Sequence, residues 1–228
     1  MNLKGVLIDF GDTLAYIDKK ENQKYEEALL STLRSFGYLK GLNMLSSSLG
    51  RMYWNSTKGE IKDFHEFWKQ LLRELGIPSE MTLIRELEEV RKRHYDSIFK
   101  LYEGAVSVLS LLEKKYKLAL VSNCAVGLSG VVEHLGLTDH FDCIILSYEV
   151  GARKPNARMY FEALKCLKLE PYECVFVADE ISDLEGAKEV GLKTLLVLQG
   201  SSTTREAKDP NFKPDFKCQN LSGIAKFL

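Results

Sequence analysis

The pattern of apolar and polar positions divides the chain into a first strand, a helical segment and a long alternating segment. The run "VLIDF" within residues 3–10 is apolar up to its aspartate, which predicts a buried strand. In residues 20–100 the apolar side chains recur at helical spacing, and no strand pattern competes with them. Helices are expected there at 25–39, 42–56, 61–77 and 81–99.

From residue 105 onwards, helical and strand patterns alternate. Helices are predicted at 105–116, 128–137, 157–169 and 183–192, and a final one at 221–228. Strands are predicted at 117–123, 141–147, 173–179 and 193–198, and a short one at 215–219. Strands that alternate with helices of this length are typical of βαβ units on a parallel sheet. The polar segment 200–215 is predicted to be a flexible loop.

These elements predict an α/β protein with two parts. A Rossmann-like parallel sheet with helices on both faces forms the catalytic core, from residues 1–17 and 101–228. An all-helical cap, residues 18–100, is inserted after the first strand.

Composition narrows the classes of function. The 228 residues are 45% hydrophobic and 28% charged, with a net charge of −1 and no cluster of basic residues, so we expect no nucleic-acid partner. No apolar run is long enough for a membrane span, and "MNLKGVLIDF" is too short for a signal peptide, so we expect a cytoplasmic protein. The composition favours neither a monomer nor a homodimer.

The five cysteines indicate no special chemistry. Their number is odd and no C-x-x-C pair occurs, so the sequence favours neither a disulfide framework nor a zinc site. We expect most of these cysteines to be small buried apolar residues.

Polar residues stand where three predicted strands end. Asp9, the pair Ser122–Asn123 and Asp179 occupy these positions. Ligands of open α/β sheets bind at the carboxyl ends of the strands, so these side chains are expected to converge. A carboxylate at the end of a buried strand is costly unless it is paired or binds a metal.

Two further charged residues fit the same edge of the sheet. Lys154 in "GARKP" precedes a helix whose N-terminus favours anions, and Asp183 follows Asp179 by four residues at a helix start. Asp179 and Asp183 beside Asp9 would form an all-oxygen pocket suited to Mg²⁺. Taken singly, each residue also fits an ordinary capping, turn or surface role.

The ordered set of motifs resembles the haloacid dehalogenase superfamily, in its branch with a helical cap. "DFGDT" is similar to the first motif of that family, "LVSN" to the second, Lys154 of "GARKP" to the third and "ADEISD" to the fourth. The resemblance covers nearly the whole chain, and the helical insert lies between the first and second motifs, as the cap of that branch does.

The resemblance implies a hydrolase of a small phosphorylated metabolite. Asp9 would attack phosphorus and form an aspartyl phosphate. Mg²⁺ would be held by Asp9, the main-chain carbonyl of Gly11, Asp179 and Asp183. In the phosphoryl site, substrate would be bound by Thr13, Ser122, Asn123 and Lys154. Lys154 would also restrain Asp9, and the cap would close over the site.

The first motif departs from the family pattern at Gly11. Phosphatases of the family have an acid–base Asp two residues after the nucleophile, whereas this chain has Gly11 there and Asp12 one place later. A metal ligand at Gly11 would survive, because it is a main-chain carbonyl. Asp12 either supplies the missing acid, if Gly11 allows a different turn, or is a turn residue that bonds backbone N–H groups.

Two alternatives follow from this departure. Metal-independent 2-haloacid dehalogenases of the family also lack that Asp, and Tyr160 and the Ser122–Asn123 pair suit them too. The acidic pair Asp179 and Asp183 argues against them. The second alternative is a phosphate-binding protein with weak or no turnover.

Overall fold

The structure is a computed structural model that describes residues 3–199 and 209–228. Residues 200–208, the larger part of the predicted loop at 200–215, lie outside the described residues. Within the described part, no helix is long and apolar enough to cross a membrane.

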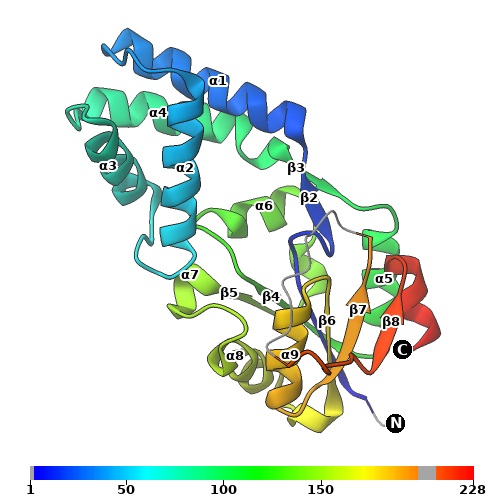
Figure 1. Cartoon of the computed structure of the whole chain (residues 1–228). Helices are drawn as coiled ribbons and strands as arrows, with labels where there is room; N and C mark the ends of the chain where they lie inside the picture. Colours follow the sequence, from blue (N-terminus) through cyan, green and yellow to red (C-terminus); the bar gives the residue numbers. More distant parts are fainter. Residues whose placement is uncertain (1–2, 200–208) are drawn as a thin grey trace.

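A six-stranded sheet in which all neighbours are parallel forms the centre of the core (Figure 1). The strand order is β5-β4-β1-β6-β7-β8. The strands are β1 (Gly5–Ile8), β4 (Lys117–Ser122), β5 (Cys143–Leu146), β6 (Cys174–Ala178), β7 (Lys193–Val197) and β8 (Phe216–Cys218). Because the chain builds first to one side of β1 and then to the other, the carboxyl ends of β4, β1 and β6 flank a natural ligand crevice. The predicted α/β fold with a parallel sheet is confirmed.

Helices cover both faces of the sheet. Successive strand residues point to opposite faces, so in β1 Leu7 packs with α8 and α9, whereas Val6 and Ile8 pack with α5 and the C-terminal turn η4. The helical elements of this part are α5 (Ala105–Leu112), α6 (Leu128–His134), η2 (Thr138–His140), α7 (Ser147–Val150), α8 (Ala157–Leu167), η3 (Pro171–Glu173), α9 (Ile181–Glu189) and η4 (Leu221–Lys226). The final helix predicted at 221–228 is a shorter 3₁₀ helix.

Four helices pack together at one end of the molecule, above the carboxyl edge of the sheet (Figure 1). They are α1 (Lys19–Ser35), α2 (Leu42–Ser56), α3 (Phe64–Leu75) and α4 (Met81–His94). We keep 18–100 as the proposed bounds of this cap.

An antiparallel ribbon that the sequence did not predict joins the cap to the core. Strand β2 (Ala15–Ile17) leads into the cap and pairs with β3 (Phe99–Leu101), which leads out of it. The helix predicted to reach residue 99 therefore ends at His94, and a 3₁₀ turn, η1 (Asp96–Ile98), precedes β3. Pairing with β2 outweighs the local helical pattern there.

Helix α3 illustrates how local sequence sets the cap. The Asp63 side chain accepts a hydrogen bond from the Glu66 N–H at 2.8 Å and caps the first turn. Gly76 ends the helix with φ 74, a left-handed conformation that glycine adopts without strain. One face of α3 is buried, and burying each apolar side chain on that face stabilises the fold by about 2 kcal/mol. The buried residues are Phe67, Trp68, Leu71, Leu72 and Leu75.

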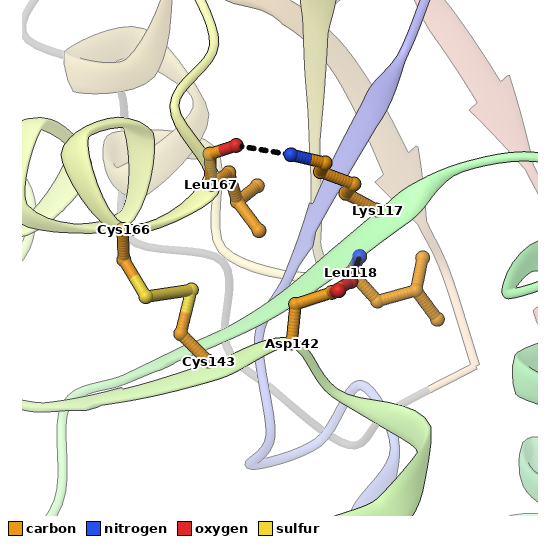
Figure 2. Close-up of a disulfide and its surroundings, with 6 residues drawn as sticks. All are labelled: Lys117, Leu118, Asp142, Cys143, Cys166 and Leu167. Carbon is orange, nitrogen blue, oxygen red and sulfur yellow. Dashed lines mark hydrogen bonds between the residues drawn. A yellow bond between two sulfur atoms is a disulfide. The ribbon is translucent and has the colours of Figure 1, made fainter.

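A disulfide corrects one expectation from the sequence. Cys143 of β5 and Cys166 of α8 are joined, with their Cα atoms 6.4 Å apart (Figure 2). The two residues are 23 positions apart, and only the packing of α8 against β5 brings them together. Cys124, Cys174 and Cys218 are free and buried, as expected.

Candidate active site

Three predicted site residues meet at the carboxyl ends of adjacent strands. Asp9 directly follows β1, Ser122 ends β4, and Asp179 directly follows β6. Since β1 lies between β4 and β6, the sheet places the three side chains at one edge. All three are buried, with exposed fractions of 7% for Asp9, 3% for Ser122 and 5% for Asp179.

Lys154 joins two of the carboxylates. Its Nζ lies 2.7 Å from Oδ1 of Asp9 and 3.1 Å from Oδ2 of Asp183, and the Lys154 side chain has no exposed surface. Asp183 comes from the first turn of α9, whose N-terminal dipole favours a negative charge. The Phe10 N–H donates to the same Asp9 oxygen at 2.7 Å. Two donors thus fix the orientation of the Asp9 carboxylate.

Asn123 holds the backbone of Lys154. Its side-chain amide donates to the Lys154 carbonyl at 3.0 Å, and its side-chain oxygen accepts from the Lys154 N–H at 2.7 Å. The loop after β4 and the segment that carries Lys154 are therefore tied together. The predicted role of Asn123 in binding substrate stays a prediction, and the contacts indicate that it positions Lys154.

The charges of this cluster do not balance. Three carboxylates are buried here, Asp9, Asp179 and Asp183, and among the described ion pairs the Lys154 ammonium contacts only Asp9 and Asp183. Burial raises the pKa of Asp9 above its usual range, Lys154 opposes this shift, and Asp183 and Asp179 add to it. Burial disfavours the charged form of Lys154, yet Asp9 and Asp183 raise its pKa above the usual value. An additional cation would relieve the excess negative charge.

Thr13 is bound to Asp179. Its hydroxyl donates to Asp179 Oδ1 at 3.1 Å and accepts from the Asp179 N–H at 3.1 Å, and the residue is fully buried. These bonds fix the Asp179 carboxylate relative to the loop after β1. Thr13 was predicted to bind substrate, which stays a prediction, and its contacts are those of a residue that positions Asp179.

The turn after Asp9 has an unexpected conformation. The left-handed residue is Asp12, with φ 52, and not Gly11. The Asp12 N–H donates to the Ala15 carbonyl at 2.8 Å, which closes the turn. A Cβ atom at Gly11 would meet nothing within 4 Å. Asp, like Asn, adopts the left-handed region more readily than most residues do, so Asp12 is a suitable residue for this position.

The Asp12 side chain reaches across to the cap ribbon. Its Oδ1 accepts a hydrogen bond from the Tyr102 hydroxyl at 3.3 Å, just beyond the end of β3. Burial raises the pKa of Asp12, the neighbouring Asp179 raises it further, and the Tyr102 hydrogen bond opposes both. The pKa of Tyr102 is raised to about 12 by burial and by Asp12.

Tyr160 lies behind the site. It is fully buried, its hydroxyl donates to the Asp183 carbonyl at 2.6 Å, and its ring packs against Phe176 with the centroids 5.3 Å apart. This placement makes Tyr160 a support for the first turn of α9.

A cavity of about 1010 Å³ extends from the loops that follow β1 and β4 to the cap, and Asp9 and Lys154 are not among its lining residues. Its core end is lined by Gly11, Asp12, Ser122 and Asn123. Its cap end is lined by residues of α1 and α2, among them Glu26 and Tyr53, and the ribbon contributes Tyr16 and Tyr102. Sequence reasoning did not identify Tyr102 or Glu26 as site residues, since nothing in their local pattern separates them from other polar positions on the cap and its flanks.

The expected metal ligands are only partly assembled. Among residues 3–199 and 209–228, no three His, Cys or acidic side chains are grouped so as to hold a metal ion. Asp183 is turned to Lys154, as described above. Mg²⁺ in proteins commonly uses one or two carboxylates and keeps several waters, so Asp9 and Asp179 still match its preference.

Comparison with a family model places the chain among known proteins. The model described as haloacid dehalogenase-like hydrolase matches residues 44–197, which is more than half of the chain. The matched region includes Ser122, Lys154, Asp179 and Asp183.

Two similar proteins of curated function are phosphatases by name. The glyceraldehyde 3-phosphate phosphatase of Methanopyrus kandleri is 26% identical over 220 residues, covering 94% of this chain and 92% of that protein. The phosphoglycolate phosphatase of Aquifex aeolicus is 31% identical over 149 residues, covering 63% of this chain and 68% of that protein.

Solved structures share the fold at lower identity. A 2-haloacid dehalogenase from Pseudomonas syringae pv. Tomato superposes with a TM-score of 0.75 at 23% identity, covering 98% of this chain and 97% of that one. A phosphatase of the same superfamily from Thermococcus onnurineus gives a TM-score of 0.69 at 22% identity, covering 99% of this chain and 97% of that one. These likenesses establish the fold.

Proposed function

Because the chain belongs to the haloacid dehalogenase-like hydrolases, we propose that it is a Mg²⁺-dependent phosphatase of a small phosphorylated metabolite. The observation that carries this proposal is the buried ion pair of Lys154 and Asp9 next to the large cavity. The two phosphatases described above, to which the chain is similar, support the same class of reaction. A cytoplasmic location stays a prediction.

The residues present fit a divalent cation. Asp9, Asp179 and Asp183 carry two more negative charges than Lys154 neutralises when all are ionised, and burying such an excess is costly. Asp9, Asp179 and the main-chain carbonyl of Gly11 would hold Mg²⁺, and Asp183 would contribute through a bound water. When bound, the metal offsets the repulsion between the Asp9 carboxylate and a phosphate dianion.

Asp9 is the nucleophile in this proposal. Its carboxylate attacks phosphorus, the bond from phosphorus to the ester oxygen breaks, and an aspartyl phosphate forms. Lys154 and the Phe10 N–H keep the carboxylate in place, while the Ser122 hydroxyl and the Lys154 ammonium face the phosphoryl oxygens. A water molecule then attacks the same phosphorus, which releases inorganic phosphate and restores Asp9.

Asp12 is the proton donor in this proposal. Of the two sequence-based alternatives, the turn role predicted that its side chain bonds backbone N–H groups, whereas its carboxylate accepts from Tyr102 at the cavity wall. A carboxyl group with a raised pKa can carry the proton that the leaving oxygen needs. The same group, once ionised, can take a proton from the attacking water.

The metal-independent dehalogenase alternative is less well supported. The buried carboxylates Asp9, Asp179 and Asp183 favour a cation, and the Tyr160 hydroxyl donates to the Asp183 carbonyl, which is a supporting contact. A phosphate-binding protein without turnover has in its favour only the absence of an acid at Gly11, and Asp12 provides a carboxyl group nearby.

One panel of assays tests these alternatives. Phosphate release from a set of phosphate esters is measured with Mg²⁺ and with a chelator, and halide release is measured from short 2-halo acids. We expect phosphate release that requires Mg²⁺ and no halide release. Halide release in the chelator would establish the dehalogenase, and phosphate binding without release of phosphate would establish the binding protein.

A further inference from the structure

The cap end of the cavity presents a carboxylate that is held in place. Glu26 of α1 accepts a hydrogen bond from Asn22 Nδ2 at 3.0 Å on one oxygen, and the Ser46 hydroxyl of α2 donates to the other oxygen. All three residues line the cavity. Because the donors come from two helices, the carboxylate has a fixed position in the cap.

The charges around the cavity are mostly negative. Asp12, Asp18 and Glu26 line it, and among the described lining residues the only Lys or Arg is Lys19, which is exposed. Two further cations, Arg153 and Lys58, do not line the cavity but lie over the ring of the lining residue Trp54, at 3.7 and 5.8 Å from its centroid. The Asp18 carboxylate caps the first turn of α1, because it accepts hydrogen bonds from the N–H groups of Lys20 and Glu21. Glu26 is therefore the anion that a bound leaving group would meet at the cap end.

The size and the other lining residues of the cavity suit a leaving group larger than a three-carbon acid. A cavity of about 1010 Å³ is at the upper end of the range for small-molecule sites. Seven aromatic side chains line it: Phe10, Tyr16, Tyr53, Trp54, Tyr95, Phe99 and Tyr102. Tyr16 and Tyr102 lie together, with their ring centroids 4.9 Å apart. The hydroxyl of Tyr102 is the group that donates to Asp12. Aromatic faces of this kind pack against the apolar faces of a ring-shaped ligand.

We propose that the substrate is a sugar-sized phosphate monoester whose leaving group is neutral or carries an ammonium group, with its hydroxyl or ammonium donors bound to Glu26. A second anionic group on the substrate would meet the Glu26 carboxylate, and the exposed Lys19 is the only Lys or Arg among the described lining residues, so esters such as phosphoglycolate are disfavoured. This inference rests on the proposed phosphatase function and deepens it.

Three probes of similar size differ in the charge of the leaving group: glucosamine 6-phosphate, glucose 6-phosphate and 6-phosphogluconate. Because 6-phosphogluconate also lacks the ring, glucosamine 6-phosphate against glucose 6-phosphate is the comparison in which the ring is kept. Their binding is measured by calorimetry with Mg²⁺ on Asp9→Asn, in which the attacking carboxylate is absent. The same titrations are made with Glu26→Gln added, and with Glu27→Gln added as the matched control. Glu27 is the adjacent acid, is exposed, bonds only Gln23 among the described contacts, and does not line the cavity.

We expect 6-phosphogluconate to bind at least about tenfold more weakly than glucose 6-phosphate, and glucosamine 6-phosphate to bind most tightly. Glu26→Gln should bring the three affinities to within about threefold of one another, whereas Glu27→Gln should keep the order. Four outcomes on the Asp9→Asn background would each overturn the inference. The three probes could bind with equal affinity, 6-phosphogluconate could bind most tightly, or none of the three could bind. The order of affinities could also survive the addition of Glu26→Gln. The order of the three affinities on Asp9→Asn alone tests the inference even if the variant with Glu26→Gln added fails to fold.

Turnover separates this inference from the function on which it rests. Phosphate release from the same three esters is measured on the wild-type protein with Mg²⁺. Binding in the expected order without release of phosphate would refute the phosphatase and leave the assigned ligand class standing. Release of phosphate with 6-phosphogluconate as the best substrate would refute the ligand class and leave the phosphatase standing.

Discussion

Nζ of Lys154 lies 2.7 Å from Oδ1 of Asp9, and both side chains are almost completely buried. Lys154 also reaches Asp183 at 3.1 Å, so it is the one cation in contact with these two carboxylates among the described ion pairs. This ion pair should therefore contribute to the stability of the fold as well as to catalysis. Urea unfolding measures the first contribution and phosphate release measures the second.

Lys154→Met should destabilise the protein strongly when a chelator is present. Removing one partner of a buried pair leaves uncompensated carboxylates, which costs about 3–5 kcal/mol in the free energy of unfolding. Urea unfolding measures this change. Lys193→Met is the control, because the partly exposed Lys193–Asp215 pair at 3.6 Å should contribute less than about 1 kcal/mol. Similar losses for the two variants would mean that the buried pair carries no special weight.

Asp9→Asn should abolish turnover. The amide cannot act as the attacking carboxylate, and loss of a nucleophile typically lowers kcat by at least about 10⁴-fold. Phosphate release with Mg²⁺ is the measurement, and circular dichroism checks the fold. Asp139→Asn, a change at an exposed position in η2, should keep the wild-type rate. Residual activity of Asp9→Asn within tenfold of wild type would exclude the covalent mechanism.

Asp12→Asn should slow poor leaving groups more than good ones. An alkyl oxygen must be protonated as it leaves, so alkyl phosphates should lose about 10²-fold or more, whereas aryl phosphates, which need little protonation, should lose far less. The slope of log kcat/KM against leaving-group pKa measures the difference. Glu103→Gln, next to Tyr102 but exposed and outside the cavity, is the control. An unchanged slope in Asp12→Asn would make Asp12 a turn residue only.

Gly11→Asp should be tolerated and should increase the turnover of alkyl phosphates. A Cβ atom at this position meets nothing within 4 Å, and Gly11 is not in the left-handed region, so steric clash and backbone strain should change the free energy of unfolding by less than about 0.5 kcal/mol. The added carboxyl group is a second proton donor, worth about tenfold or more. Gly11→Asn controls for size. If Gly11→Asn gives the same increase, the effect is not acid catalysis.

The buried cysteines should make the folded protein less stable at alkaline pH. Burial raises the pKa of Cys124 and of Cys174 to about 12. The folded pKa lies above the unfolded value, so the buried neutral thiols favour the folded state at pH below about 9, and this contribution is lost as the pH rises from about 9 to 12. Urea midpoints measured between pH 8 and pH 11 should fall.

Thiol titration checks the same residues. At pH 8 the native protein should react with a thiol reagent at none of its three free cysteines. The unfolded protein should react at three without reductant and at five after reduction, because Cys143 and Cys166 are joined. Five reactive thiols before reduction would contradict the disulfide, and rapid reaction of the native protein would contradict the burial.

The sequence alone determined the core strands, most of the helices and the order of the motifs. Apolar periodicity over a few residues sets the buried faces of α3 and of the core strands, and local caps such as Asp63 and Gly76 mark where α3 begins and ends. Asp9, Ser122 and Asp179 could be placed at strand ends because each follows an apolar run directly. These features depend on neighbours along the chain, which a sequence displays.

Only the tertiary structure decided which side chains meet. Lys154 touches both Asp9 and Asp183, and Asn123 holds the Lys154 backbone, because the strand order puts β1 between β4 and β6. The same holds for the ribbon of β2 and β3, for the disulfide, and for the cavity wall at Glu26. Each depends on contacts between segments far apart in the chain, and their free energy outweighs local propensity without leaving a periodic pattern in the sequence.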